Sequence, residues 1–223
     1  LVPLGMFKLH NLAISNVIGV LWAAAMFAWF FVSALYMQLV LGYSAMQVGL
    51  AFLPANLIMA AFSLGLSAKM VMRWGIRPPL VAGLLLAGIG LALFARAPLN
   101  GNFWLDVFPG MLLLGLGSGM ALNPVLLAAM DDVSPTESGL ASGVVNTAFM
   151  MGGALGLAVL ASLADARTDA LRTAGSEPVA ALNGGYQLAF LVGAVFAGVA
   201  AIMGTRLRPT QAARAAEAAQ VQA

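Results

Sequence analysis

The segment SAMQVGLAFLPAN at residues 44–56 recurs, ninety residues further on, as SPTESGLASGVVN at residues 134–146. Each segment begins with a serine that is followed three residues later by Gln47 or Glu137, which is the pattern of a capping box at a helix N-terminus. Five of the thirteen aligned positions are identical: the pairs Ser44/Ser134, Gly49/Gly139, Leu50/Leu140, Ala51/Ala141 and Asn56/Asn146. The recurrence predicts two equivalent helices, one starting at each serine, with Pro135 in the first turn of the second.

The composition around these segments is that of a chain that lies in a lipid bilayer. Hydrophobic residues make up 62% of the 223 residues and charged residues 8%, against roughly 25% charged in a soluble domain. Five stretches lack Asp, Glu, Lys and Arg altogether: 9–68, 78–95, 107–130, 138–164 and 178–205. A membrane-spanning helix needs about 20 apolar residues, so the first stretch must turn back once, at "GYS" (42–44). We therefore predict an all-α membrane protein with six transmembrane helices, near residues 12–41, 46–72, 78–96, 104–130, 135–163 and 184–205.

The positive charges orient these six helices, because Lys and Arg are enriched in the cytoplasmic loops of membrane proteins. One side of the predicted bundle carries Lys8, Lys69, Arg73, Arg77, Arg206, Arg208 and Arg214, and the other carries Arg96, Arg167 and Arg172. We therefore expect both termini in the cytoplasm. A lead-in segment (1–11) and a tail (207–223) flank the transmembrane domain (12–206), and residues 164–183 are expected to form a solvated, mobile outer loop.

In this topology the two repeated helices run in opposite directions, since the second span starts on the outer side and the fifth on the inner side. Two similar three-helix units of opposite direction form an inverted repeat, and a 3+3 inverted repeat is nested in each six-helix half of major facilitator transporters. Asn56 and Asn146 lie twelve residues past their serines, or roughly 18 Å along a helix. Half of the hydrocarbon thickness is roughly 15 Å, so both amides are expected near the midplane.

The motifs GLAFLPANL, GLSAKMVMRWGIRP and SGLASGVVNTAFMMGGALG, with the opening segment LVPLGMFK, resemble those of the major facilitator superfamily. The resemblance is to the C-terminal six helices, most like the fourteen-helix drug:proton antiporter branch, and it extends to about Pro209. It implies a secondary transporter that works by alternating access. The first, second, fourth and fifth helices would then face the N-terminal half of the same transporter, and the third and sixth would face lipid. Because the chain begins with Leu1 rather than Met, we interpret it as a piece of a longer protein.

The inner loop after the second helix contains a version of the family's loop motif. Its matching residues are Gly65, Arg73, Gly75 and Arg77. Met72 stands where the family has an acidic residue, which puts the charge relay of that motif in doubt for this half. Gly75 favours the left-handed conformation that ends a helix, and the cations of this loop suit anionic lipid headgroups.

Two hypotheses account for the charges at the inner side. By the parity of the helices, Asp131 and Asp132 lie on the same side as Lys69 and Arg73. In one hypothesis, Arg73 or Lys69 pairs with Asp131 or Asp132 in one state of the transport cycle and separates in the other, forming a latch. In the other, the charges only signal topology and are solvated, since an exposed ion pair contributes about 0–1 kcal/mol.

One face of the first helix carries aromatic and sulfur-containing side chains at helical spacing: Trp22, Met26, Trp29, Ser33 and Tyr36. Such a face suits the wall of a substrate cavity, through stacking and cation–π contacts, or it packs against neighbouring helices and lipid. The resemblance favours the first alternative, because the first helix of each triplet lines the central path in this family. Phe149 and Met150 stand where the family has a basic or polar pair, and Met150 joins the substrate-path candidates.

Three asparagines are the strongest polar groups within the predicted spans: Asn56, Asn123 and Asn146. They either join helices by hydrogen bonds or contact substrate near the midplane. The small-residue patterns at Gly115/Gly119 and Gly139/Gly143, and the run GGALG at 152–156, predict close helix packing.

The sequence also indicates which functions to leave aside. No ionisable residue lies deep in a span between Lys69 and Arg206, and there is no paired carboxylate, His cluster or Ser/His/Asp set at that depth. We therefore expect no enzyme, no catalytic residue, no cofactor and no metal, and the scattered cations do not indicate nucleic acid. Proton coupling normally uses an intramembrane carboxylate or His, so the proton carrier is expected in the N-terminal half.

The sequence as a whole predicts the C-terminal half of a proton-coupled exporter of drugs or other small amphipathic molecules, in a bacterial cytoplasmic membrane. The alternative is a stand-alone six-helix membrane protein that dimerises as a carrier, channel or scaffold.

Overall fold

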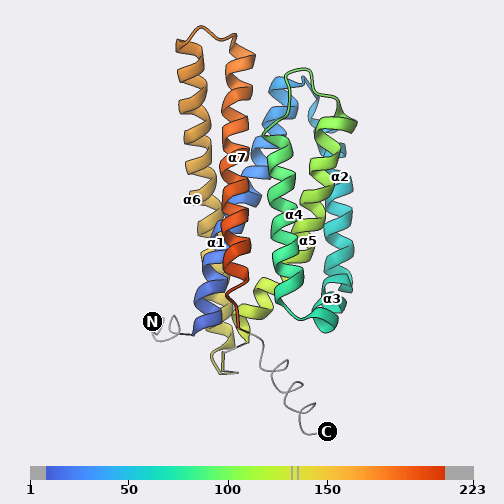
Figure 1. The fold of residues 1–223 in the computed structure, drawn as a ribbon, viewed down its shortest axis with the longest axis vertical. Coiled ribbons are helices and arrows are strands. Elements are labelled where there is room, and N and C mark those ends of the chain that lie inside the picture. The colour runs from blue at the N-terminus through green and yellow to red at the C-terminus, as the bar shows by residue number, and fades with distance from the viewer. Residues whose placement is uncertain (1–8, 132, 135, 209–223) are drawn as a thin grey trace.

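The computed structural model describes residues 9–131, 133–134 and 136–208 as a bundle of helices without a strand (Figure 1). The α-helices are α1 (His10–Leu35), α2 (Ala45–Ala61), α3 (Ser67–Trp74), α4 (Arg77–Phe94), α5 (Phe108–Met130), α6 (Ser138–Thr173) and α7 (Pro178–Gly204). Turns of π-helix lie at Tyr36–Val40, Phe62–Leu66 and Phe103–Val107. Together they form six helices that are long and apolar enough to cross a membrane, which confirms the predicted number of spans. Lys8, Asp132, Pro135 and Arg214 lie outside the described residues, with most of the lead-in segment and of the tail.

The six spans alternate in direction, so both ends of the described chain lie at one end of the bundle (Figure 1). We call this the inner end and the opposite end the outer end. Helix α2 starts at the outer end and α6 starts at the inner end, as the inverted topology requires.

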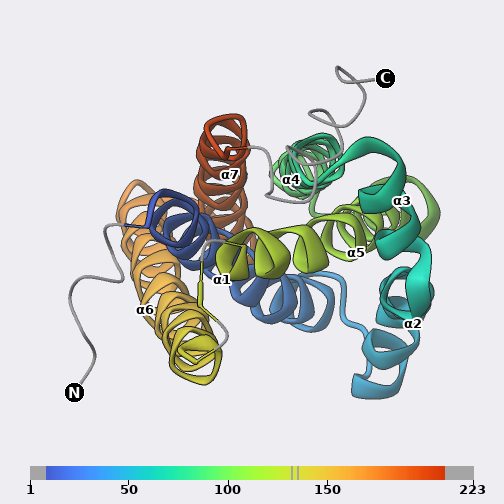
Figure 2. The same ribbon diagram turned by 90° about the horizontal axis from the view of Figure 1, so that it is seen from below.

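The packing of the helices repeats the symmetry of the sequence. Helix α1 packs against α6 and α7, and α5 packs against α2 and α4. In the repeat, α1 corresponds to α5, α2 to α6 and α4 to α7. Exchanging the two helices of each pair converts the first set of contacts into the second, so the two halves pack alike. Seen from the inner end, α1 and α5 lie in the middle, α4 and α7 on one side, and α2 and α6 at the flanks (Figure 2). The arrangement is the predicted 3+3 inverted repeat.

The two repeated helix starts differ from each other in the structure. At Ser44 the capping box is formed: the Gln47 backbone donates to Ser44 Oγ (3.3 Å) and the Ser44 backbone donates to Gln47 Oε1 (2.8 Å). The prediction for Ser134 was wrong, since α6 begins only at Ser138 and its N-cap is Glu137. Here Ser134 Oγ donates to the Glu137 carboxylate at 3.0 Å. This charge-assisted bond engages both side chains in a turn ahead of the helix.

Close backbone contacts at glycine hold the centre of the bundle together. A Cβ atom at Gly117 would lie 2.7 Å from the Ala87 backbone nitrogen, and one at Gly115 would lie 2.8 Å from Ala55 Cα. On the other side of the bundle, a Cβ at Gly152 would lie 2.6 Å from Val20 Cα. Helix α5 therefore meets α4 and α2, and α6 meets α1, with no room for a side chain.

These contacts confirm two of the three predicted small-residue packing motifs, at Gly115/Gly119 and within 152–156. The third pattern makes no close contact within this chain. A Cβ at Gly139 or at Gly143 would meet no heavy atom within 4 Å, because this face of α6 is turned away from the other helices of the chain.

The second span is broken near its inner end, which the predicted uninterrupted helix over 46–72 missed. Gly65 has a φ of 128°, in a region that favours glycine, and the short helix α3 follows the break. Gly75 (φ 77°) ends α3 as predicted, and Pro78 lies in the first turn of α4.

The prediction of a mobile outer loop over 164–183 was also wrong. Helix α6 runs to Thr173 and α7 starts at Pro178, so only a short turn joins them. The 36 residues of α6 extend over about 54 Å, well beyond a hydrocarbon core of roughly 30 Å. The charges of this segment interrupt the apolar pattern but not the helix, because its Ala, Arg and Leu residues favour helix in water as well.

Hydrogen bonds connect neighbouring segments at both ends of the bundle. At the outer end, Asn183 Nδ2 and Gln187 Nε2 both donate to the Ala97 carbonyl (3.1 and 3.0 Å), and the Tyr36 hydroxyl donates to the Pro98 carbonyl (2.8 Å). At the inner end, the Arg208 backbone donates to Asn11 Oδ1 at 2.9 Å. These bonds fix the loop after α4 onto α1 and α7, and the start of α1 onto the chain that follows α7.

The glycine contacts generate a stability prediction. Replacing Gly117 by Leu should lower the free energy of unfolding by about 1–3 kcal/mol or more, because overpacking forces α4 and α5 apart. Gly198→Leu is the matched control, since a Cβ there meets no heavy atom within 4 Å. Thermal unfolding of the whole protein in detergent measures the difference, and equal midpoints for the two variants would contradict the packing described.

Candidate functional site

The aromatic face predicted on the first helix lies inside the bundle. Trp22, Trp29 and Tyr36 have no exposed surface, and the Tyr36 hydroxyl is bonded to the loop after α4. Met26 is half-buried and lies with Phe27 and Phe30 at a separate hollow. The three large rings therefore pack against neighbouring helices, and the cavity wall expected of them is not formed by their side chains in this arrangement.

The three asparagines within the spans lie in different surroundings. Asn56 on α2 and Asn146 on α6 are exposed, at equivalent places of the two repeats, and Asn123 on α5 is half-buried. Among the described residues, none of the three side chains makes a hydrogen bond with another residue. Of the two alternatives, hydrogen bonding between helices is therefore not observed for these amides within the described part of the chain.

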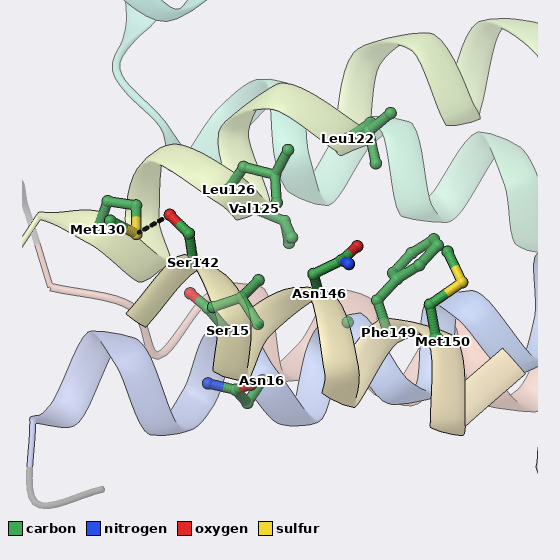
Figure 3. A pocket seen from close by; sticks show the side chains of 12 residues that line it. Ser15, Asn16, Leu122, Val125, Leu126, Met130, Ser142, Asn146, Phe149 and Met150 are labelled. Atoms are coloured by element: carbon green, nitrogen blue, oxygen red, sulfur yellow. Dashed lines mark hydrogen bonds between the residues drawn. The ribbon is translucent and has the colours of Figure 1, made fainter. Parts of the chain in front are cut away.

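A pocket of about 410 Å³ lies in the inner half of the bundle, where α1, α5 and α6 meet (Figure 3). Its lining comes from all three helices: Ser15, Asn16 and Gly19 of α1; Leu122, Val125, Leu126 and Met130 of α5; and Ser142, Val145, Asn146, Phe149 and Met150 of α6. The buried residues that form its floor are Ser15, Asn16, Gly19, Val125 and Val145, whereas Leu126, Asn146 and Met150 are exposed at its rim. Most of the surface that the pocket presents is apolar.

Two polar atoms of the floor have no hydrogen-bond partner. Ser15 has no exposed surface and its Oγ is unpartnered. Asn16 is 8% exposed, and its Nδ2 donates to the Leu12 carbonyl at 2.8 Å while its Oδ1 is unpartnered. At the rim, the Ser142 hydroxyl contacts the Met130 sulfur at 3.8 Å (Figure 3). Both unpartnered atoms lie beneath the surface of the pocket, and the indole nitrogens of Trp22 and Trp29 on the same helix are buried without a partner as well.

The pocket unites only part of what the sequence predicted. Asn146 and Met150 line it, whereas Asn56, Asn123 and Trp22 do not. Sequence reasoning missed its floor, although a signal was present: Ser15 lies one helical turn before Gly19, and Ser142 one turn before Asn146.

No charged side chain lines the pocket. Among residues 9–131, 133–134 and 136–208, no group of three His, Cys, Asp or Glu side chains gathers as metal ligands do. The pocket therefore offers apolar contact and, at its rim, the uncharged polar groups of Ser142 and Asn146.

The inner cations lie on a separate part of the molecule. Lys69 and Arg73 are exposed on α3, and the Arg73 guanidinium lies 5.6 Å from the centre of the Trp74 ring. The inner end of α5, which leads to Asp131, packs against the first turns of α1 and α6, through Ala129 among others, and α5 also contacts α3. The latch stays a prediction, since one of its proposed members, Asp132, lies outside the described residues.

The comparisons with known proteins agree on one protein family. A model of the Major Facilitator Superfamily matches residues 3–157. Cephamycin export protein CmcT of Amycolatopsis lactamdurans is 30% identical over 169 residues, which cover 75% of this chain and 35% of that protein. Puromycin resistance protein pur8 of Streptomyces alboniger is 36% identical over 176 residues, with the same two shares. The chain thus corresponds to about a third of the length of these curated relatives.

The exposure of the pocket rim can be measured by chemical labelling, because the chain has no cysteine. In a whole transporter without other cysteines, Ser142→Cys should react with a small maleimide at least tenfold faster than Ser118→Cys. Ser142 is exposed at the rim, whereas Ser118 is 1% exposed and buried within α5. Similar rates at the two positions, compared by mass spectrometry, would show that the rim is covered in the whole protein.

Proposed function

This chain belongs to the major facilitator superfamily, and we propose that it is the C-terminal half of a secondary transporter that exports small amphipathic molecules by alternating access. The observation that carries this proposal is the pocket between the central helices α1 and α5 and the flanking helix α6. It has the size range of small-molecule sites, about 300–1,000 Å³, and it combines an apolar wall with uncharged polar groups.

The missing partner of this chain is proposed to be the N-terminal half of the same transporter. Asn56 and Asn146 are exposed on α2 and α6, and Gly139 and Gly143 face open space. A polar amide turned towards hydrocarbon is unfavourable, which supports a face that meets protein or a water-filled cavity. Helices α4 and α7, on the opposite side (Figure 2), are then the pair that faces lipid.

Proton coupling is part of the proposal through the N-terminal half. The pocket has no titratable side chain among its lining residues, and transporters that move protons use carboxylates or histidines within the membrane. The resemblance to the drug:proton antiporter branch supports antiport. The names of the two relatives, which refer to cephamycin export and puromycin resistance, support antibiotics as the substrate class.

Efflux from cells tests the proposed transport activity. A bacterial strain without its main efflux pumps should accumulate less puromycin or less of a cephamycin when it expresses the whole transporter, because substrate is exported. A protonophore should restore accumulation to the level of an empty-vector control. Unchanged accumulation of every compound tested, with the protein present in the membrane, would contradict the proposed function.

The proposed orientation, with the inner end in the cytoplasm, has a separate test. Lys69→Cys and Glu177→Cys place one thiol at each end of the bundle, and both native side chains are exposed. A membrane-impermeant maleimide added to intact cells should label position 177 and leave position 69 unlabelled until the cells are opened. The reverse pattern would invert the topology that the positive charges predict.

A further inference from the structure

We propose that the short helix α3, at the inner end of the bundle, is a binding surface for an anionic phospholipid, whose phosphate is held by Lys69 and Arg73. This inference goes beyond the proposed transport, because it concerns the lipid around the protein and not the molecule that is exported.

The break at Gly65 gives α3 its position. Gly65 has a φ of 128°, which kinks the span there, and α3 then packs beside α4 and α5. Seen from the inner end, α3 lies at the edge of the bundle (Figure 2). Because α3 connects the inner ends of two spans, α2 and α4, it lies at the level of the lipid headgroups.

Two cations of α3 are available to a ligand. Lys69 and Arg73 lie one helical turn apart, on the same face of the helix. Both side chains are exposed, and within the described part of the chain neither forms an ion pair with a carboxylate. The Arg73 guanidinium lies over the Trp74 ring, which leaves its N–H groups for an acceptor. Lys and Arg together suit the oxygens of a phosphate group.

The residues around these cations do not neutralise them. Helix α3 contains no Asp or Glu, and Met72 stands where the loop motif of the resembled family has an acidic residue. The cations at the outer end differ, since Arg167 and Arg172 share α6 with Asp165 and Asp169. The inner pair therefore attracts an external anion more strongly than the outer pair does.

Exposed apolar side chains favour a lipid over a soluble anion. Met72 is 80% exposed and Trp74 is 53% exposed, within one turn of the two cations. Tryptophan is enriched at membrane–water interfaces, where its ring lies at the headgroup level. Ser67, in contrast, is buried against the bundle. One buried side and one exposed side that mixes cations with apolar groups are typical of a helix that lies on a membrane surface.

Titration of the purified whole transporter with lipid in a non-ionic detergent tests this surface. Dioleoylphosphatidylglycerol should raise the midpoint of thermal unfolding of the wild type, because a ligand that binds the folded state stabilises it. In the double variant Lys69→Gln/Arg73→Gln, the lipid concentration that gives half of this effect should rise about thirtyfold, since each cation contributes about fivefold.

Three controls define the ligand and its location. The double variant Arg167→Gln/Arg172→Gln removes two exposed cations of the outer end and should leave the half-effect concentration unchanged. Dioleoylphosphatidylcholine has the same acyl chains without net charge, so it should act equally on the wild type and both variants. Sodium phosphate has charge without acyl chains and should not stabilise the wild type at the same concentrations.

The possible results separate a lipid from the other partners of these cations. Equal half-effect concentrations in the wild type and the inner double variant overturn the proposal, as does equal stabilisation by sodium phosphate. No response of the wild type to phosphatidylglycerol, with a lower midpoint of the inner double variant in detergent alone, shows that the cations pair with a carboxylate of the protein and also overturns it. The measurement does not use transport, so its result is independent of the efflux assay.

Discussion

Backbone-to-backbone contact between helices is the interaction on which the rest of this bundle depends. In lipid, apolar side chains gain little by meeting one another, so helices associate where small residues let their backbones approach closely. Here the contacts lie at Gly117 against α4, Gly115 against α2 and Gly152 against α1. They join α5 to both of its neighbours and α1 to α6, with the glycines on the central helix in one repeat and on the flanking helix in the other. Each central helix packs against the two neighbours that the repeat assigns to it.

Glycines without a neighbouring helix mark the places where the molecule is open. Gly19, Gly139 and Gly143 have no neighbour within reach of a Cβ atom, and they border the inner half of α1 and the free face of α6. Where a glycine lies against the backbone of another helix, the two helices are in close contact. Where no atom of another helix lies near the glycine, a space remains beside it. The pocket lies at one such space, between helices that are held in place by the contacts elsewhere along their length.

The fold could be predicted well from the sequence and the candidate site only in part. The number of spans and their alternation follow from charge-free stretches, which is a property of local composition. The break at Gly65 and the length of α6 do not follow from these stretches. Hydropathy shows which residues are apolar, but it shows neither which residues are helical nor where a helix bends. Asn146 was recognised as an isolated polar residue. Ser15 and Asn16 were not predicted, because the aromatic residues of the same helix, Trp22 and Trp29 among them, form the more obvious sequence pattern.

The sequence by itself determined the membrane class, the six helices and the opposed directions of the two triplets, because length, composition and repetition are all local features of the chain. Only the tertiary structure decided which side of each helix faces inwards. A helix that is apolar on all sides has no face that must be buried, so its rotation about its own axis is set by the glycines and loops that it meets. That rotation buries Trp22, Trp29 and Tyr36 in the core and places Ser15 and Asn16 beneath the pocket.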